Sequence, residues 1–176
     1  MTTQNEIHIR DARVEDRDDI ERLMVAAYEQ YADVLPAPRW EQYEANIRAS
    51  VDKEGPVARI VAELDGRIVG SVLLFVSSED AYGRSDLNIH TPIIRLLSVS
   101  PSVRGKGIAT ALIKESVRRS LELGAELLHL HTSDMMASAV RLYERLGFER
   151  AVDKDMYNGE TLVKSYKLHL KQTAIL

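Results

Sequence analysis

Two glycines flanked by basic residues form the segment of this sequence that is best suited to hold an anion. The segment reads Arg104-Gly105-Lys106-Gly107, and the surrounding apolar patterns predict a strand before it and a long helix after it. Glycine lets a backbone approach a ligand closely, and a helix N-terminus presents unpaired N–H groups at the positive end of the helix dipole. Arg104 and Lys106 add positive charge at the same place. The chemistry expected of this turn is the binding of a pyrophosphate-like anion.

Three interpretations of the turn compete. The simplest is a helix-entry turn that needs glycine for its geometry and carries solvated basic side chains. A dinucleotide-binding Rossmann turn would need a third glycine where this chain has Thr110, and a tighter link to the strand than Pro101 to Arg104 allows. A triphosphate-binding loop is excluded, because Gly107 is not followed by four spacers and a Gly-Lys pair. The third interpretation is a resemblance to a protein family, and it depends on motifs in the rest of the chain.

Hydrophobic periodicity predicts the elements that must position this turn. Strands are expected at residues 7–10, 57–64, 67–76, 93–99, 126–131, 148–152 and 162–170. Helices are expected around residues 20–31, at about 38–51, from the turn to 123, and at 135–146. Asp65-Gly66 predicts a hairpin, because both residues tolerate positive φ. Residues 77–90 are expected to form a polar loop. This order of hairpins and crossovers predicts a mixed sheet with helices packed on it.

Size and composition exclude several classes of protein. The 176 residues favour one domain over residues 1–176, and 45% hydrophobic with 28% charged residues is typical of a globular chain. The net charge of −4 argues against nucleic-acid binding, which needs a basic field. The absence of cysteine excludes disulfides, thiolate nucleophiles and cysteine-ligated metals. No signal peptide or membrane-spanning run is visible, so we expect a cytoplasmic location and no membrane partner.

The chain resembles the GNAT-type N-acetyltransferase superfamily in four segments that follow in the family's order. The motif Arg104-x-x-Gly107-x-Ala109 matches the pyrophosphate-binding signature. The other three segments are the following: Ile9-Arg10-x-Ala12-x-x-x-Asp16-x-x-x-Ile20, Leu96-Leu97-Ser98-Val99-Ser100-Pro101, and Ala139-x-x-Leu142-Tyr143-Glu144-x-Leu146-Gly147-Phe148. The resemblance implies a GNAT-like α/β fold, with a mixed, mostly antiparallel sheet of about six to seven strands and about four flanking helices.

The resemblance also implies a reaction, the transfer of an acetyl group from acetyl-CoA to a primary amine by direct attack. A bulge in the central strand would free backbone groups for the pantetheine arm and for the oxyanion of the tetrahedral intermediate. The cofactor-binding residues would be Leu97, Ser98, Val99, Arg104, Gly105, Lys106, Gly107, Ile108, Ala109 and Thr110. Tyr143 matches the tyrosine that protonates the leaving thiolate, a feasible transfer because a thiol has a pKa of about 8.5 and a phenol about 10. Tyr143 also borders an apolar helix stripe, so a packing role stays open.

Two departures from the family leave the general base unassigned. Many relatives carry Glu where this chain has Ile93, and Asn where it has Met136. His90 and His131 lie at or near strand ends, and either could be a base, a substrate contact or an ordinary strand-end residue. His129 and His131 share one face of a strand but lack a third ligand, so we predict no metal.

The acceptor and the assembly are less determined. We expect a small-molecule or peptide amine, and an exposed sheet edge could support a homodimer. In the family, the loop between the first two helices often covers the acceptor site; here residues 28–40 carry three aromatics and two prolines, which equally suit a packing loop. Two alternatives of other classes remain, a non-catalytic acyl-CoA-binding regulatory domain of the same fold and a dinucleotide-dependent enzyme.

Overall fold

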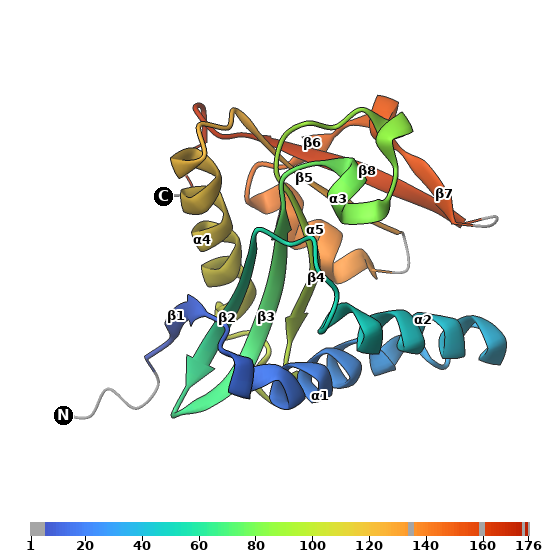
Figure 1. The fold of residues 1–176 in the computed structure, drawn as a ribbon, viewed down its shortest axis with the longest axis vertical. Helices are drawn as coiled ribbons and strands as arrows, with labels where there is room; N and C mark the ends of the chain where they lie inside the picture. The colour runs from blue at the N-terminus through green and yellow to red at the C-terminus, as the bar shows by residue number, and fades with distance from the viewer. Residues whose placement is uncertain (1–5, 134–135, 159–160, 174, 176) are drawn as a thin grey trace. The chain divides into compact units, whose positions relative to one another are not determined.

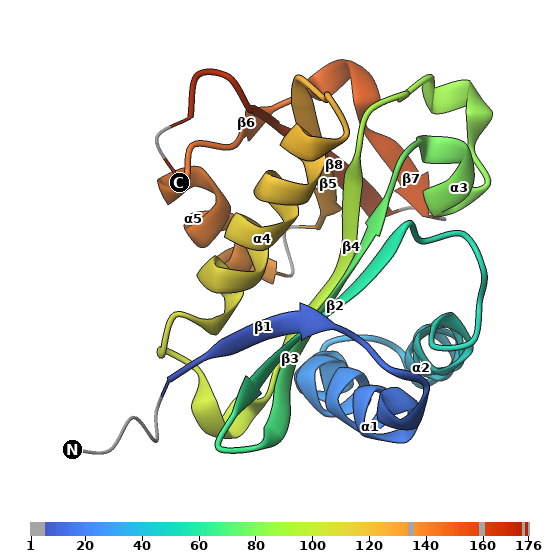
Figure 2. The ribbon, with the colours of Figure 1, turned by 60° about the vertical axis from the view of Figure 1, so that its left-hand side comes forward.

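The computed structural model describes residues 6–133, 136–158, 161–173 and 175. The chain forms two compact units. Unit 1 comprises Met1–Leu73 and Leu96–Glu115, and unit 2 comprises Leu74–Arg95 and Ser116–Leu176. Three elements, β3, β4 and α4, have residues in both units. Figures 1 and 2 show the elements in two views.

The strands of unit 1 follow the order β1-β2-β3-β4. They are β1 (His8–Asp11), β2 (Ala58–Leu64), and the unit 1 parts of β3 (Arg67–Phe75) and β4 (Ile93–Val99). β1 runs antiparallel to β2, with Ile9 opposite Ala62. Asp65 and Gly66 join β2 to β3 with φ of 53° and 78°, which confirms the predicted hairpin and its physical reason.

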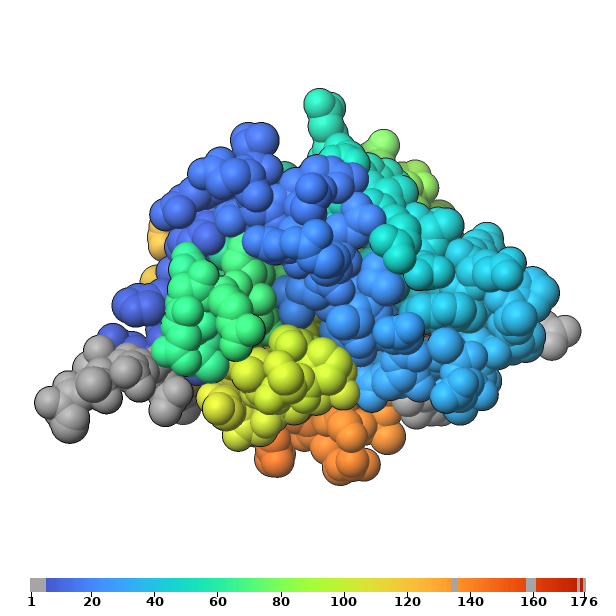
Figure 3. Space-filling model, turned by 90° about the horizontal axis from the view of Figure 1, so that it is seen from below, coloured from blue at the N-terminus to red at the C-terminus, as the bar shows by residue number. Residues whose placement is uncertain are grey.

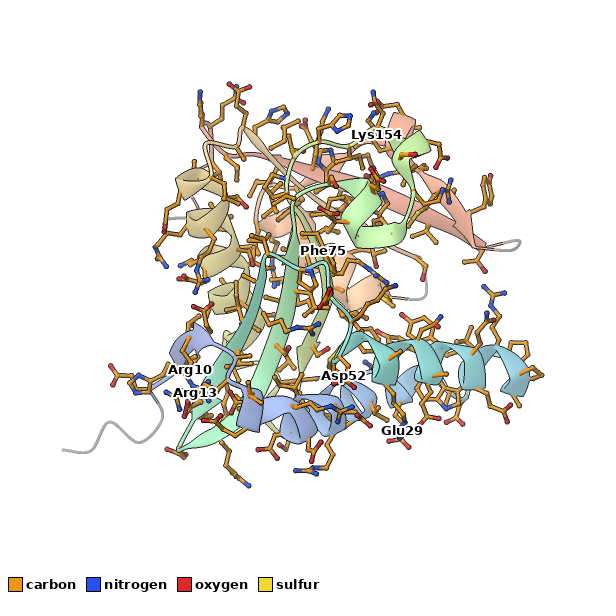
Figure 4. The ribbon with its side chains drawn as sticks, in the orientation of Figure 1. Arg10, Arg13, Glu29, Asp52, Phe75 and Lys154 are labelled. Carbon is orange, nitrogen blue, oxygen red and sulfur yellow. The ribbon has the colours of Figure 1, made fainter. Side chains whose placement is uncertain are left out.

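Two helices, α1 (Arg17–Tyr28) and α2 (Ala37–Ser50), lie side by side in unit 1. Short 3₁₀ turns, η1 (Val14–Asp16) and η2 (Glu29–Tyr31), flank α1, and η4 (Pro101–Val103) follows β4. The helix predicted around residues 20–31 is α1, but it ends at Tyr28, and Tyr31 lies in η2 and is only half-buried. The buried residues of α1 are Ile20, Leu23, Met24, Ala27 and Tyr28. Arg10, labelled in Figure 4, pairs with Asp16 at 2.7 Å and lowers the pKa of that carboxyl. This pair fixes the link between β1 and the start of α1.

The strands of unit 2 surround the long C-terminal strand β8 (Thr161–His169). β8 is antiparallel to β5 (Leu127–Thr132), β6 (Glu149–Arg150) and β7 (Met156–Asn158). The unit 2 part of β4 runs parallel to β5. The helical elements are α3 (Ser78–Tyr82), η3 (Ser85–Leu87), the end of α4 (Ile108–Glu122), α5 (Ala137–Arg145) and η6 (Val152–Lys154). The predicted mixed α/β fold with a mostly antiparallel sheet is confirmed.

The segment 77–90, which the sequence predicts to be a polar loop, is instead partly helical and partly buried. The side chain of Ser77 accepts a hydrogen bond from the Asp80 N–H at 3.2 Å and caps α3. Ala81, Leu87 and Ile89 are buried, with exposed fractions of 3%, 8% and 2%. The prediction was wrong because charged residues separate these apolar ones and hide the short helix.

Two further boundaries differ from the sequence-based expectation. The strand predicted at 148–152 is limited to Glu149–Arg150, because η6 begins at Val152, and β7 was not predicted at all. The helix predicted from 135 is described from Ala137, and Met135 lies outside the described residues. Gly124 and Gly147 have φ of 80° and 102°, as expected of residues that end helices.

Gly70 in β3 allows α4 to lie directly on the sheet. A Cβ added there would lie 2.7 Å from Ile108 Cγ2 and 2.9 Å from Leu112 Cδ1. Both side chains are fully buried, with exposed fractions of 1% and 0%, so neither can swing into solvent. The lack of a side chain at Gly70 therefore determines how closely the first turn of α4 approaches the sheet.

Gly70→Ala is expected to lower the free energy of unfolding by about 1–3 kcal/mol, the usual cost of overpacking a core. Urea unfolding measures the change. The double variant Gly70→Ala/Ile108→Ala should lose less than the sum of the two single losses, because the second change removes the atom nearest to the new methyl group. Strictly additive losses would contradict this account of the contact.

Candidate functional site

A bulge interrupts the central strand β4 at Leu96. This leucine has φ of 54°, in the left-handed region that bulky residues rarely adopt. A single left-handed residue within a strand is typical of a β-bulge, which re-aims the neighbouring backbone groups. The bulge lies where the family resemblance implies one.

Two side-chain hydrogen bonds hold the peptide groups on either side of Leu97. The hydroxyl of Ser98 donates to the Leu96 carbonyl at 3.0 Å, and the phenol of Tyr28 donates to the Leu97 carbonyl at 2.9 Å. Ser98 and Tyr28 are buried, with exposed fractions of 1% and 9%. Because a peptide group is planar and trans, a held Leu96 carbonyl also fixes the direction of the Leu97 N–H. The sequence did not predict this use of Tyr28.

The predicted anion-binding turn leads into α4 as expected. The Ala111 N–H donates to the Gly107 carbonyl at 3.0 Å, which is the first turn of the helix. Helix geometry therefore gives the N–H groups of Ile108, Ala109 and Thr110 no acceptor within the helix. These are donors at the positive end of a 15-residue helix.

Gly105 and Gly107 are needed for the backbone conformation of this turn, and not because a side chain at either position would clash. Their φ angles are 83° and 80°, while a Cβ added to either would meet nothing within 4 Å. Arg104, Gly105, Lys106 and Gly107 are exposed, and the yellow segment between β4 and α4 reaches the surface in Figure 3. An incoming anion can therefore reach the turn.

Arg104 departs from the simplest expectation, because its guanidinium contacts α1. Nη2 donates to the Ala27 carbonyl at 3.0 Å, and Nη1 donates to Gln30 Oε1 at 3.2 Å. A cation at a helix C-terminus is stabilised by the helix dipole. The side chain of Arg104 thus ties the turn to the end of α1, while its backbone stays in the turn.

An aromatic cluster of unit 1 surrounds the Tyr28 ring. Tyr28 lies 6.1 Å from Tyr31 and 5.9 Å from Tyr43, centroid to centroid, and Tyr43 stacks on Trp40 at 6.2 Å. Burial raises the pKa of Tyr31. Tyr28 and Tyr31 of segment 28–40 therefore pack on one another, and Trp40 joins them through Tyr43.

Tyr143 belongs to unit 2, whereas the other predicted site residues belong to unit 1. It is buried, with 8% exposed, in the last turns of α5, and its ring centroid is 5.9 Å from that of Phe148. Ile93, at the family's Glu position, is fully buried, and Met136 precedes the first residue of α5. These contacts suit the packing role, and the acid role of Tyr143 stays a prediction.

The histidines named in the sequence have different surroundings. His90 is exposed and hydrogen-bonds to Asn88 at 2.7 Å. His129 pairs with the Thr91 hydroxyl at 3.1 Å, and burial lowers its pKa to about 4. His131 lies 3.0 Å from the Tyr82 hydroxyl. No three histidine, aspartate or glutamate residues gather as metal ligands within the described part of the chain.

None of the described helices is both long and apolar enough to cross a membrane. A mixed sheet, a bulged central strand and a glycine-rich turn at a helix N-terminus together define an acyltransferase-like architecture. The comparisons with known proteins agree. The chain belongs to the acetyltransferase (GNAT) family, which it matches over residues 17–148.

Two curated relatives show how far this similarity extends. The chain is 36% identical over 90 residues to N-acetyltransferase family 8 member 2 of Rattus norvegicus, which covers 51% of this chain and 38% of that protein. It is 27% identical over 142 residues to mycothiol acetyltransferase of Propionibacterium freudenreichii subsp. shermanii, with 80% and 41% covered. The chain thus matches about two fifths of the length of these relatives.

Among solved structures, the chain is similar to the acetyltransferase yncA of Salmonella typhimurium, determined with its cofactor acetyl-CoA. The TM-score is 0.62 with 17% identity, and 96% of each chain is covered. At this level of identity the likeness shows the fold.

Proposed function

We propose that this protein binds acetyl-CoA and transfers the acetyl group to a primary amine. The observation that carries the proposal is the arrangement within unit 1, where a bulged strand leads through a glycine turn into a helix N-terminus. The acetyl-CoA bound by the yncA relative supports this choice of donor. Family membership supports the type of reaction.

The binding role divides between the turn and the strand. The N–H groups from Gly105 to Thr110 would receive the pyrophosphate, because donors and dipole both favour an anion there. The pantetheine arm would bond to the backbone of Leu97, Ser98 and Val99. Leu97 N–H would then stabilise the oxyanion, a contact that matters most when the carbonyl becomes tetrahedral.

The reaction needs two proton transfers. The amine nitrogen forms a bond to the thioester carbon, the carbon–sulfur bond breaks, and the nitrogen loses a proton. Tyr143 would supply a proton to the leaving thiolate as general acid. The amine proton needs a separate acceptor, which neither Ile93 nor Met136 can provide.

Thermal shift with acetyl-CoA, CoA, NAD and ATP tests the binding half of the proposal. Stabilisation by acetyl-CoA and CoA is expected, since anything that binds the folded state raises the melting temperature. Stabilisation by NAD alone would favour the dinucleotide-dependent alternative. Thiol release over a panel of small and peptide amines then separates an enzyme from a non-catalytic acyl-CoA-binding domain.

A cytoplasmic location, a homodimer and the absence of nucleic-acid and membrane partners belong to the same proposal.

Tyr28→Phe is expected to lower kcat about tenfold while the Kd for acetyl-CoA changes little. The substitution keeps the ring but removes the hydroxyl that holds the Leu97 carbonyl. The lost bond anchors the peptide group that follows Leu97, whereas the Leu97 N–H belongs to the peptide group before it, so the oxyanion donor is disturbed only through the Leu97 Cα. A donor misaligned in this way costs less than a deleted one, for which losses of about 100-fold or more are typical. Steady-state kinetics and CoA titration measure the two quantities.

Tyr166→Phe is the matched control, because Tyr166 is another buried tyrosine, 4% exposed, in β8 of unit 2. It should retain wild-type kcat. An equal loss in both variants, or a loss of acetyl-CoA affinity in Tyr28→Phe alone, would refute the positioning role.

A further inference from the structure

The end of α1 is bonded to two separate points of the chain that follows the bulge in β4. The phenol of Tyr28, the last residue of α1, donates to the Leu97 carbonyl at 2.9 Å. The carbonyl of Ala27, the residue before it, accepts a hydrogen bond from Arg104 Nη2 at 3.0 Å. All four residues belong to unit 1. Two consecutive residues of one helix therefore hold both ends of segment 97–104, which runs from the bulge to the start of the glycine turn.

Gln30 is the second partner of Arg104 at this helix end. Its Oε1 accepts from Arg104 Nη1 at 3.2 Å, and its Nε2 donates to the Ala27 carbonyl at 3.1 Å. Ala27 lies in the last turn of α1, where helix geometry leaves carbonyl groups without an N–H partner. A guanidinium presents its N–H donors in a rigid fork, so one arginine can bond to two acceptors at once. Ala27 and Gln30 together therefore fix the direction of the Arg104 side chain.

The charge of Arg104 acts on the same part of unit 1. The negative end of the α1 dipole favours a cation at this place. Burial raises the pKa of Tyr31 in η2, and the nearby Arg104 charge opposes that rise. In Figure 3 the yellow segment that contains the turn borders the blue atoms of the α1 region. The guanidinium is thus directed at the end of α1, while the backbone of the turn carries the N–H groups that suit an anion.

Segment 97–104 is also attached to the sheet between its two ends. The Ser100 N–H donates to the Val69 carbonyl of β3 at 2.8 Å. This bond anchors the middle of the segment, so a disturbance at Arg104 does not pass freely along the chain to Leu97. The direct route between the two ends runs through Ala27 and Tyr28, which are neighbours in α1. Release of Arg104 would therefore loosen the end of the helix that holds the Leu97 carbonyl.

We propose that Arg104 and Gln30 are positioning residues for the acetyl-transfer step. They keep the end of α1, and with it the Tyr28 hydroxyl, against the bulged strand. The proposal rests on the proposed function, and it adds a role at the thioester end of the cofactor to a residue of the pyrophosphate turn. A guanidinium that bound the pyrophosphate directly would instead affect only donors that carry a pyrophosphate. The two roles therefore predict different results with a shortened donor.

The test compares acetyl-CoA with acetylpantetheine, which carries the thioester but lacks the pyrophosphate and the adenosine. Arg104→Met keeps the aliphatic stem and removes every donor. It should lower kcat/KM with acetylpantetheine about tenfold, the order of magnitude lost with a hydrogen bond to a charged group. The kcat at saturating acetyl-CoA should fall by a similar factor, and it provides the measurement if acetylpantetheine proves too poor a donor. Saturation removes any difference in affinity from that comparison.

Gln30 tests the same contact without a change of charge in the turn. Gln30→Leu removes both polar atoms from an exposed side chain and should lower the same kinetic constants about threefold, since a neutral hydrogen bond contributes less. Gln30→Glu keeps an acceptor for Arg104 Nη1 and should behave as wild type.

A double-mutant cycle tests the route through the helix. In a Tyr28→Phe background, Arg104→Met should cost clearly less than it does alone, because the hydroxyl through which it acts is already absent. Strictly multiplicative losses in kcat would show that the two side chains act independently and would overturn the proposal.

Arg22→Met is the matched control, because Arg22 is an exposed arginine of α1 that pairs with Asp19 in the same helix. It should behave as wild type with both donors. An Arg104→Met variant that loses only affinity for acetyl-CoA, with wild-type kcat, would make Arg104 a direct ligand of the pyrophosphate and would overturn the positioning role. Since Gln30 is exposed, Gln30→Leu decides the question even where Arg104→Met fails to fold. A wild-type protein that transfers no acetyl group from acetyl-CoA would instead refute the proposed function.

Discussion

Gly107→Asp is expected to weaken acetyl-CoA binding about 100-fold. The left-handed conformation costs an L-residue roughly 1–2 kcal/mol, and Gly107 has φ of 80°. The turn can relieve this strain by leaving the conformation that exposes the N–H groups. A carboxylate beside them also repels the pyrophosphate, by about 1 kcal/mol for two unit charges roughly 4 Å apart in water. Since 1.4 kcal/mol is tenfold in affinity, the two effects together give about two orders of magnitude.

Calorimetric titration of CoA measures this loss of affinity. The variant Gly107→Ala separates its two causes, the backbone strain and the added charge. A Cβ at this position meets nothing within 4 Å, so alanine adds the backbone strain without the charge. We expect the alanine variant to lose about tenfold in affinity, which corresponds to the strain alone. Equal losses for Ala and Asp would show that charge plays no part in this turn.

Gly124→Asp is the matched control, because Gly124 has the same φ of 80° and the same open space, but it follows the C-terminus of α4. It should lower stability without changing the Kd for CoA. Wild-type CoA affinity in Gly107→Asp would remove the turn from the cofactor site.

The sequence predicted most of the fold because its strong signals are local. The Asp65-Gly66 turn, the apolar stripe of α1 and the terminal glycines of the long helices each depend on a few neighbouring residues. The helix α3 was missed, although Ser77 and Asp80 have the spacing of an N-terminal cap. Its five residues are too few for hydrophobic periodicity to register.

The residues of the candidate site also fall into those that the local sequence predicts and those that it does not. The glycine turn was predictable, since its chemistry depends on consecutive residues. Tyr28 was not, because its partner Leu97 is 69 residues away in sequence. A side chain that completes a site through a long-range hydrogen bond has no local pattern. Sequence reasoning therefore left the general base unassigned.

Tyr143→Phe is expected to reduce kcat about 100-fold, a typical contribution of a general acid, while CoA binding stays nearly intact. The substitution keeps the ring that packs on Phe148 and removes the hydroxyl, so it separates the acid role from the packing role. Without the phenol, the leaving thiolate must take its proton from water. Stopped-flow thiol release measures the chemical step.

The acid role makes a second, independent prediction. Donor thioesters whose thiols have a lower pKa leave readily without protonation, so they should lose much less in Tyr143→Phe than acetyl-CoA does. A packing defect would slow all donors equally and would lower the free energy of unfolding as well. Unchanged turnover with acetyl-CoA would remove Tyr143 from the mechanism. Retained turnover with activated donors alone, together with wild-type stability, would identify its hydroxyl as the source of the proton.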